Sequence, residues 1–190
     1  MTANIHARLV TGARRLLELT TARRWIRQQD GATTVEFALV AAPFMAMIFA
    51  IMETAIVFFA GQSLETAAAD SARLIMTGQA QTSGFDQTKF KQAVCAKIFG
   101  LFDCANGLYI DVKNYPAFAG ISTAKPLTNN GLLDTSNFGY APGGPGDIVV
   151  VRLMYQWPVY VSLLGLNLAD TSNGKRLLVS TVAFRNEPYL

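Results

Sequence analysis

The longest hydrophobic pattern in the chain is an apolar run from Phe37 to Ala60, in which Glu53 is the only charged residue. As a helix, these 24 residues would extend about 36 Å, at about 1.5 Å per residue. A hydrocarbon core is about 30 Å thick, so the run can cross a membrane with some tilt. The buried helix of a soluble protein is the alternative, but the length and the single charge favour a membrane span.

A second helical pattern follows without a break. Residues 62–76 contain strong helix formers and neither Pro nor Gly. Thr77-Gly78 then provides a stop signal. The sequence therefore predicts one helix from about Thr33 to Met76, half of it in lipid and half the spine of a domain outside the membrane. The apolar positions that form one stripe in its second half are Leu64, Ala68, Ala72 and Ile75.

The remaining sequence predicts a small α+β domain. A helix capped by the segment Ser83 to Asp86 is expected to run to about Phe99. Residues 108–115, 147–157 and 177–185 are rich in β-branched and aromatic side chains and predict three strands. An antiparallel three-stranded sheet packed against the helices is the simplest arrangement. A long loop rich in Gly, Asn, Ser and Pro is expected over residues 116–145.

The charge distribution predicts the orientation of the span. Residues 1–31 carry six Arg against two acidic residues, a net of +4, and residues 32–190 carry ten basic against eleven acidic residues, a net of −1. Basic residues stay on the cytoplasmic side, so the N-terminus is expected inside and the C-terminal part exported. The nearly neutral exported part has no electrostatic footprint for nucleic acid.

This orientation predicts three regions. Residues 1–31 form a basic cytoplasmic leader, either an amphipathic helix on the membrane surface or a disordered segment. Residues 32–61 form the membrane helix, and residues 62–190 form an exported periplasmic α+β domain. The expected location is therefore an inner membrane crossed once, with the C-terminal domain in the periplasm.

The junction between leader and span reads Gly31-Ala32-Thr33-Thr34-Val35-Glu36-Phe37. A glycine followed five residues later by a carboxylate, at the start of a hydrophobic segment, is the arrangement of a type IV prepilin processing site. Gly31 has no side chain, so an extended backbone can fit closely into a protease cleft. Glu36 lies near the membrane boundary, where ionisation costs less than at the centre. The alternative is an ordinary interfacial carboxylate favoured by the helix dipole.

These residues resemble a known family. Residues 31–60 are similar to the TadE-like segment of the tight-adherence (Tad or Flp) pilus system, through the stretch GATTVEFALVAAPFMAMIFAIMET with its carboxylate-Phe-Ala-Leu opening, its proline and its second glutamate. The Ala-rich stretch from Ala67 to Arg73, the two cysteines and the ending from Phe184 to Tyr189 also resemble these proteins.

The resemblance implies a minor pilin-like subunit of the bacterial inner membrane. A prepilin peptidase would cut between Gly31 and Ala32, making Glu36 the fifth residue of the mature chain, and Glu36 would pair with the freed amine of an adjacent subunit. Phe37 belongs to the same processing signature. The implied partners are this peptidase, other minor pilin-like subunits, the major pilin and the inner-membrane assembly platform, in addition to the lipid bilayer.

The span contains a pattern suited to packing against other helices. Small residues at every fourth position let helix backbones approach closely in a membrane, although alanine is common enough here for chance to be the alternative. Glu53 lies near the same side of the helix. Its carboxyl group is either uncharged, or reaches the headgroups, or pairs with a partner helix, and we expect the contact with a partner helix. Pro43 is expected to bend the helix. The small residues are Ala38, Ala42, Ala46, Ala50 and Thr54.

Cys95 and Cys104 are the two cysteines, both on the exported side. An oxidising compartment favours a disulfide between them, and two buried free thiols are the alternative. Their spacing does not match a zinc site.

His6 is the only histidine and lies in the leader, so the exported domain is expected to hold no metal, no cofactor and no catalytic triad. The stretch Ser122 to Lys125 fits S-x-x-K but has no S-D-N or K-T-G partner.

Two classes of function follow, and neither is an enzyme. The first is a minor pilin-like subunit that initiates or assembles a Tad pilus. The second is an uncleaved, membrane-anchored periplasmic domain that binds a ligand or a cell-wall component. Cleavage after Gly31 distinguishes them.

Overall fold

The computed structural model describes residues 31–98, 100, 102–160, 165 and 167–189. The chain divides into two compact units, one that ends at Ile48 and one that begins at Phe49. The leader conformation, and with it the position of His6, lies outside the described residues.

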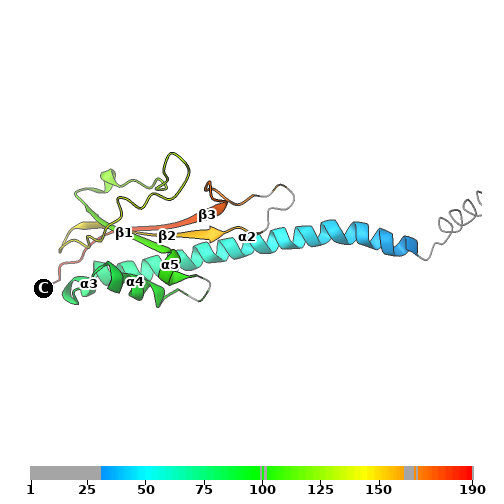
Figure 1. Ribbon diagram of the computed structural model, residues 1–190. Helices are drawn as coiled ribbons and strands as arrows, with labels where there is room; N and C mark the ends of the chain where they lie inside the picture. The colour runs from blue at the N-terminus through cyan, green and yellow to red at the C-terminus, as the bar shows by residue number, and fades with distance from the viewer. Residues whose placement is uncertain (1–30, 99, 101, 161–164, 166, 190) are drawn as a thin grey trace, which may run out of the picture. The chain divides into compact units, whose positions relative to one another are not determined.

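Helix α2 spans Ala32–Met76 and confirms the long helix expected from the hydrophobic pattern (Figure 1). Pro43 lies inside it without ending it. At its C-terminal end the Thr77 amide bonds the Arg73 carbonyl and the Gly78 amide bonds the Ile75 carbonyl, each at 3.0 Å. Gly78 then takes the left-handed conformation, with φ of 76°, that commonly ends a helix.

The side chains of α2 have two kinds of surroundings. The side chains of the first two turns are exposed, and Phe37 has 73% of its surface accessible. From Ala50 onward one face is buried at intervals of three and four residues, the spacing of one helical stripe. The buried residues are Ala50, Glu53, Val57, Ala60, Leu64, Ala67, Ala68, Ser71, Ala72 and Ile75.

A three-stranded antiparallel sheet packs against this stripe. It contains β1 (Leu108–Tyr115), β2 (Ile148–Pro158) and β3 (Lys175–Arg185), with β2 in the centre. Val151 of β2 lies opposite Val112 of β1 and Val182 of β3. The structure confirms the α+β class, and each strand lies within two residues of its predicted bounds.

The core between helix and sheet combines aliphatic and aromatic side chains. Val149, Val151 and Leu153 of β2 are fully buried beside the α2 stripe. Three aromatic rings meet near the C-terminal end of β2. The ring centroid of Phe102 lies 4.8 Å from that of Tyr155 and 5.7 Å from that of Trp157, and both pairs are edge-to-face. Edge-to-face aromatic pairs of this kind add to the stabilisation from burial alone.

Helix α4 is shorter than the sequence predicts. It spans Gln87–Cys95, and the Asp86 carboxylate caps it by accepting a 2.7 Å hydrogen bond from the Lys89 amide. The expected extension to Phe99 is wrong. After Cys95 the chain forms tight i to i+3 turns, and the Ile98 amide bonds the Cys95 carbonyl at 3.3 Å.

Cys95 and Cys104 form the predicted disulfide, with their Cα atoms 5.7 Å apart. The pairing requires the chain to reverse direction between them, which explains why α4 stops at the first cysteine. Two short helices complete the domain, α3 (Gln79–Thr82) and α5 (Cys104–Gly107).

The segment 116–145 is largely a loop, as predicted, with one short 3-10 helix, η2 (Phe118–Gly120). Its far end covers part of the outer edge of β1. The Val112 amide bonds the Gly139 carbonyl and the Ala141 amide bonds the Val112 carbonyl, each at 2.8 Å. This pairing protects an edge that would otherwise expose backbone groups.

A buried carboxylate holds the same part of the loop. Asp111 accepts hydrogen bonds from Arg152 at 2.9 Å and from the Gly139 amide at 3.1 Å, and Lys113 lies 3.4 Å away. Paired in this way, its charge is tolerated in the interior. Next to it, burial and, to a lesser degree, the charge of Asp86 raise the pKa of Tyr140 to about 12, so its phenol stays protonated.

The C-terminal residues close the domain against the end of α2. The Glu187 amide bonds the Met76 carbonyl at 2.9 Å, and the buried Asn186 amide group donates to the carbonyls of Pro142 and Gly144, each at 2.9 Å. The ring of Tyr189 lies over Gly78, where an added Cβ would come within 2.3 Å of it.

We predict that Gly78→Ala lowers the free energy of unfolding by about 2–3 kcal/mol. Two effects combine, because a non-glycine residue is strained at positive φ and the new methyl group would overlap the Tyr189 ring. Gly84→Ala is the matched control, since Gly84 also has positive φ but nothing lies within 4 Å of its added Cβ. Chemical unfolding of the detergent-solubilised variants measures both effects. Equal losses in the two variants would contradict the role given to Tyr189.

Candidate functional site

The predicted processing junction, Gly31-Ala32, lies at the first residues that the structure describes. Gly31 is exposed and directly precedes α2, which begins at Ala32. An added Cβ at Gly31 would meet nothing within 4 Å, and its φ is not in the left-handed region. The described fold therefore does not require glycine here, so a requirement for it would come from outside the described chain.

Glu36 lies on the exposed surface of the first turns of α2, among the exposed apolar side chains of Val35 and Phe37. Among the described residues the ion pairs involve Asp111 and Asp170 as the acidic partners, and Glu36 takes part in none of them. A carboxylate near a helix N-terminus is favoured by the helix dipole. Its role in an assembly stays a prediction.

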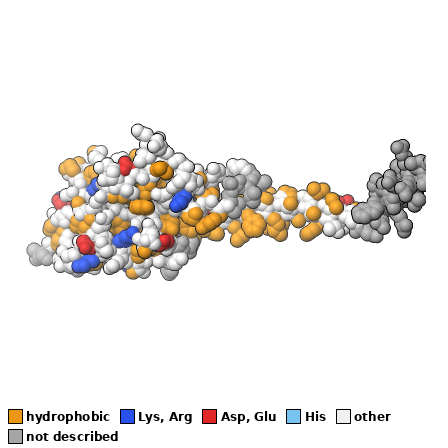
Figure 2. Space-filling view, viewed as in Figure 1, with side chains coloured by type: hydrophobic (Ala, Val, Ile, Leu, Met, Phe, Trp, Pro, Cys, Tyr) orange, Lys and Arg blue, Asp and Glu red, His pale blue; other side chains and the backbone are white. Residues whose placement is uncertain are grey.

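The expected helix-packing residues fall into two groups. Ala38, Ala42 and Pro43 are exposed and Ala46 is partly exposed, so their surface is accessible to another helix. Ala50 is buried. In the space-filling view, hydrophobic side chains cover the visible surface of this stretch of α2 (Figure 2).

Glu53 is only 7% exposed and has a partner from its own chain. Its Oε1 accepts a 3.2 Å hydrogen bond from the backbone amide of Tyr160, which follows the end of β2 and is 107 positions away in the sequence. A partner helix was the contact expected from the sequence. That contact stays a prediction, and burial leaves this carboxylate little surface for it.

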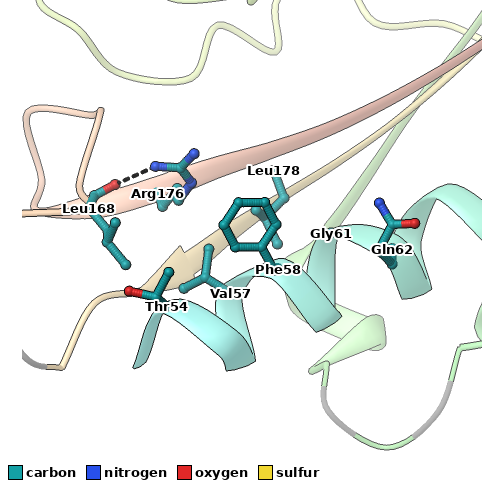
Figure 3. A pocket seen from close by; sticks show the side chains of 8 residues that line it. All are labelled: Thr54, Val57, Phe58, Gly61, Gln62, Leu168, Arg176 and Leu178. Atoms are coloured by element: carbon teal, nitrogen blue, oxygen red, sulfur yellow. Dashed lines mark hydrogen bonds between the residues drawn. The ribbon is translucent and has the colours of Figure 1, made fainter. Parts of the chain in front are cut away.

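A groove lies beside this contact, between α2 and the start of β3 (Figure 3). It encloses about 200 Å³. Arg176 and Gln62 provide its strongest polar groups, and Gly61 leaves its wall open because it has no side chain. The lining residues are Thr54, Val57, Phe58, Gly61, Gln62, Leu168, Arg176 and Leu178.

Arg176 and Asp170 form the charged part of the groove's surroundings. Arg176 donates one hydrogen bond to the Leu168 carbonyl at 3.1 Å. Burial alone would raise the pKa of Asp170, but hydrogen bonds from Lys125 and from the Leu177 amide, together with the charges of Lys125 and Arg176, lower it below its ordinary value. The carboxylate is therefore ionised at neutral pH and holds Lys125 of the long loop near the groove.

This pairing also bears on the S-x-x-K stretch. The Lys125 ammonium bonds the Asp170 carboxylate, and the Ser122 hydroxyl oxygen accepts a bond from the Ala124 amide at 3.4 Å. The ammonium is thus held by a carboxylate from another part of the chain. Within the described residues, no three His, Cys, Asp or Glu side chains gather to hold a metal ion.

Residues 31–73 match the family model described as TadE-like protein. The chain carries a TadE-like segment. This finding confirms the resemblance drawn from residues 31–60, and it extends the similarity to Arg73, near the end of α2. The TadE-like segment thus begins at the glycine of the proposed processing site and stops before the sheet. No curated protein and no solved structure matches the chain.

Sequence reasoning missed Tyr160, Arg176 and the groove, because each depends on contacts between distant segments. One local signal was available. Gly61 interrupts a run of helix formers, and glycine inside a helix costs stability unless its small size is used.

We predict that Glu53→Leu speeds hydrogen exchange of the Tyr160 amide roughly tenfold, because the amide loses its acceptor. Glu53→Gln retains an oxygen at this position and should leave exchange nearly unchanged. Hydrogen–deuterium exchange of the detergent-solubilised protein measures both variants. Unchanged exchange in the leucine variant would contradict the contact.

We also predict a pH-dependent contribution from Asp170. Because its folded pKa is lowered, its stabilising effect is present above the unfolded value of about 3.9 and is lost as pH falls through the folded value. Its side chain is 28% exposed, so solvent screening limits the effect to the order of 1 kcal/mol. The free energies of unfolding of Asp170→Asn and wild type should differ at pH 6, and the difference should shrink as the pH falls below about 3.9. Asp70→Asn, at an exposed position of α2, is the control. A difference independent of pH would contradict the assignment.

Proposed function

We propose that this chain is a minor pilin-like subunit that helps to initiate or assemble a Tad pilus at the bacterial inner membrane. The observation that carries the proposal is the TadE-like segment, which begins at Gly31 and covers nearly all of α2. The first half of that helix exposes apolar side chains. Such a surface is costly in water and favourable in lipid or against other apolar helices.

Three further observations support membrane insertion and the orientation of the chain. Among the described residues, α2 is the one helix long and apolar enough to cross a bilayer. The stretch from Phe37 to Phe58 would extend about 32 Å, close to the thickness of a hydrocarbon core. With six arginines in the leader, the N-terminus faces the cytoplasm. The disulfide between Cys95 and Cys104 fits an exported domain, since disulfides persist in oxidising compartments.

Processing would change the chemistry of the N-terminus. A prepilin peptidase that cuts between Gly31 and Ala32 removes a leader of net charge +4 and frees the amine of Ala32. Glu36 then becomes the fifth residue of the mature chain. In an assembly its exposed carboxylate would pair with the freed amine of an adjacent subunit.

Assembly would use the exposed part of α2. Ala38, Ala42 and Ala46 form a small-residue face on which another helix can approach closely. The partners would be other minor pilin-like subunits, the major pilin and the assembly platform. In this proposal residues 1–31 are the leader, 32–61 the membrane helix and 62–190 the periplasmic domain, and from Ala50 onward one face of the helix already packs within the domain.

One observation favours a second function, an uncleaved membrane anchor that carries a periplasmic binding domain. An open cleft of about 620 Å³ lies between α4, β1 and the long loop, with Lys91, Tyr109 and Phe138 in its wall. A ligand of the cell envelope could occupy it without any processing at Gly31.

We predict that the wild-type protein, extracted from membranes of cells that contain the peptidase, begins at Ala32, and that Gly31→Leu keeps residues 1–31. A leucine side chain would block close approach of the backbone to the protease. Intact-mass spectrometry measures the N-terminus. Gly84→Ala, a glycine change within the exported domain, is the control and should be cleaved normally. A wild-type N-terminus at Met1 or Thr2 would contradict the proposal and favour the uncleaved anchor.

A further inference from the structure

We propose that the groove between α2 and β3 holds one anionic phospholipid, whose phosphate binds Arg176 and whose acyl chains follow the exposed apolar surface of α2. The inference rests on the membrane insertion proposed above and names a ligand for the chain at its membrane boundary.

The groove has the right composition for the upper part of a lipid. Apolar side chains of Val57, Phe58, Leu168 and Leu178 line most of it, and it encloses about 200 Å³. Polar groups are few and lie at its ends, with Arg176 beside Leu168 and Gln62 one turn beyond Phe58 (Figure 3). A mostly apolar concave surface with a few placed polar groups is typical of small-molecule sites.

The glycine at position 61 independently favours a ligand in the groove. Glycine is less favourable than alanine inside a helix. The fold does not require it here, because an added Cβ at Gly61 would meet nothing within 4 Å. The absence of a side chain at Gly61 instead widens the groove. The open space therefore results from the residue type at this position and not from loose packing of its neighbours.

Arg176 supplies the charge that an anionic headgroup needs. A guanidinium has five N–H donors in a planar fork that suits phosphate, and the Leu168 carbonyl is the acceptor the structure gives it. The neighbouring charges are Lys125 and Asp170, which pair with each other, the exposed Lys175, and the buried Glu53, whose carboxylate accepts the Tyr160 amide. Glu65 accepts a bond from Gln62 at 3.4 Å, at the opposite end of the groove. The positive charge of the groove therefore lies at the end that contains Arg176.

Continuity with the apolar surface of α2 selects lipid over other occupants. Phe58 is 69% exposed and belongs both to the groove and to the apolar surface of the helix. Ile51, Met52 and Ile56, within two turns of it, are also exposed. A molecule that fills the groove next to this surface needs a polar, anionic end and an apolar end, and phospholipid has both.

The test is native mass spectrometry of the full chain, purified in detergent and supplemented with phosphatidylglycerol. Gly61→Leu fills the groove, and Gly61→Ala is its control. Arg176→Gln removes the cation, and Lys175→Gln, at an exposed neighbouring cation, is its control. We expect a one-lipid adduct in wild type and in both controls. We expect a roughly tenfold smaller bound fraction in Gly61→Leu and in Arg176→Gln.

Equal adducts in Gly61→Leu and Gly61→Ala, with matching thermal unfolding, would overturn the proposal. Equal losses in Arg176→Gln and Lys175→Gln would also overturn it, because they would indicate unspecific charge attraction. If Gly61→Leu kept its lipid but lost a co-purifying subunit, the groove would hold a partner helix instead. The same spectra report the mass of the N-terminus, so absence of lipid and absence of processing are read separately.

Discussion

The structure depends on one constraint, that a single helix must suit two environments. Along α2, apolar side chains before Ala50 are mostly exposed, while from Ala50 to Ile75 one stripe is buried against the sheet. Small residues such as Ala60, Ala68 and Ala72 let the sheet lie close to the helix backbone along this stripe. The other faces of the same turns still carry exposed apolar side chains up to Phe59. The domain thus packs on one face of α2, and a bilayer or other apolar helices can cover its exposed apolar faces.

Contacts between distant segments then fix the domain on that helix. Glu53 accepts the Tyr160 amide at one end of the packed stripe, and the Met76 carbonyl accepts the Glu187 amide at the other. Between them Asp111 joins the sheet to the long loop. Glu53 and Asp111 are buried, so their contacts satisfy carboxylates that would be costly if buried alone. The contacts of Glu53 and Met76 hold the domain on α2, and those of Asp111 hold the long loop on the sheet.

Much of this fold was predictable from local pattern. The helix Ala32–Met76 follows from its apolar composition and the stop at Gly78, and the strands follow from their β-branched runs. The end of α4 could not be predicted from local pattern. Phe90, Val94 and Ile98 keep helical spacing, but the disulfide to Cys104 turns the chain at Cys95. The contact of Glu53 and the groove at Arg176 also could not be predicted, since each joins residues more than 100 positions apart. The processing site after Gly31 stays a prediction, and it could be proposed from the sequence because its pattern is contiguous.

A count of pili on cells that lack this chain tests its proposed role in pilus assembly most directly. Electron microscopy of the deletion strain, and of the strain with the wild-type sequence restored, provides the count together with the amount of major pilin sheared from the surface. We expect surface pili to be lost or sharply reduced in the deletion strain and to return on complementation. Normal numbers of pili in the deletion strain would contradict it.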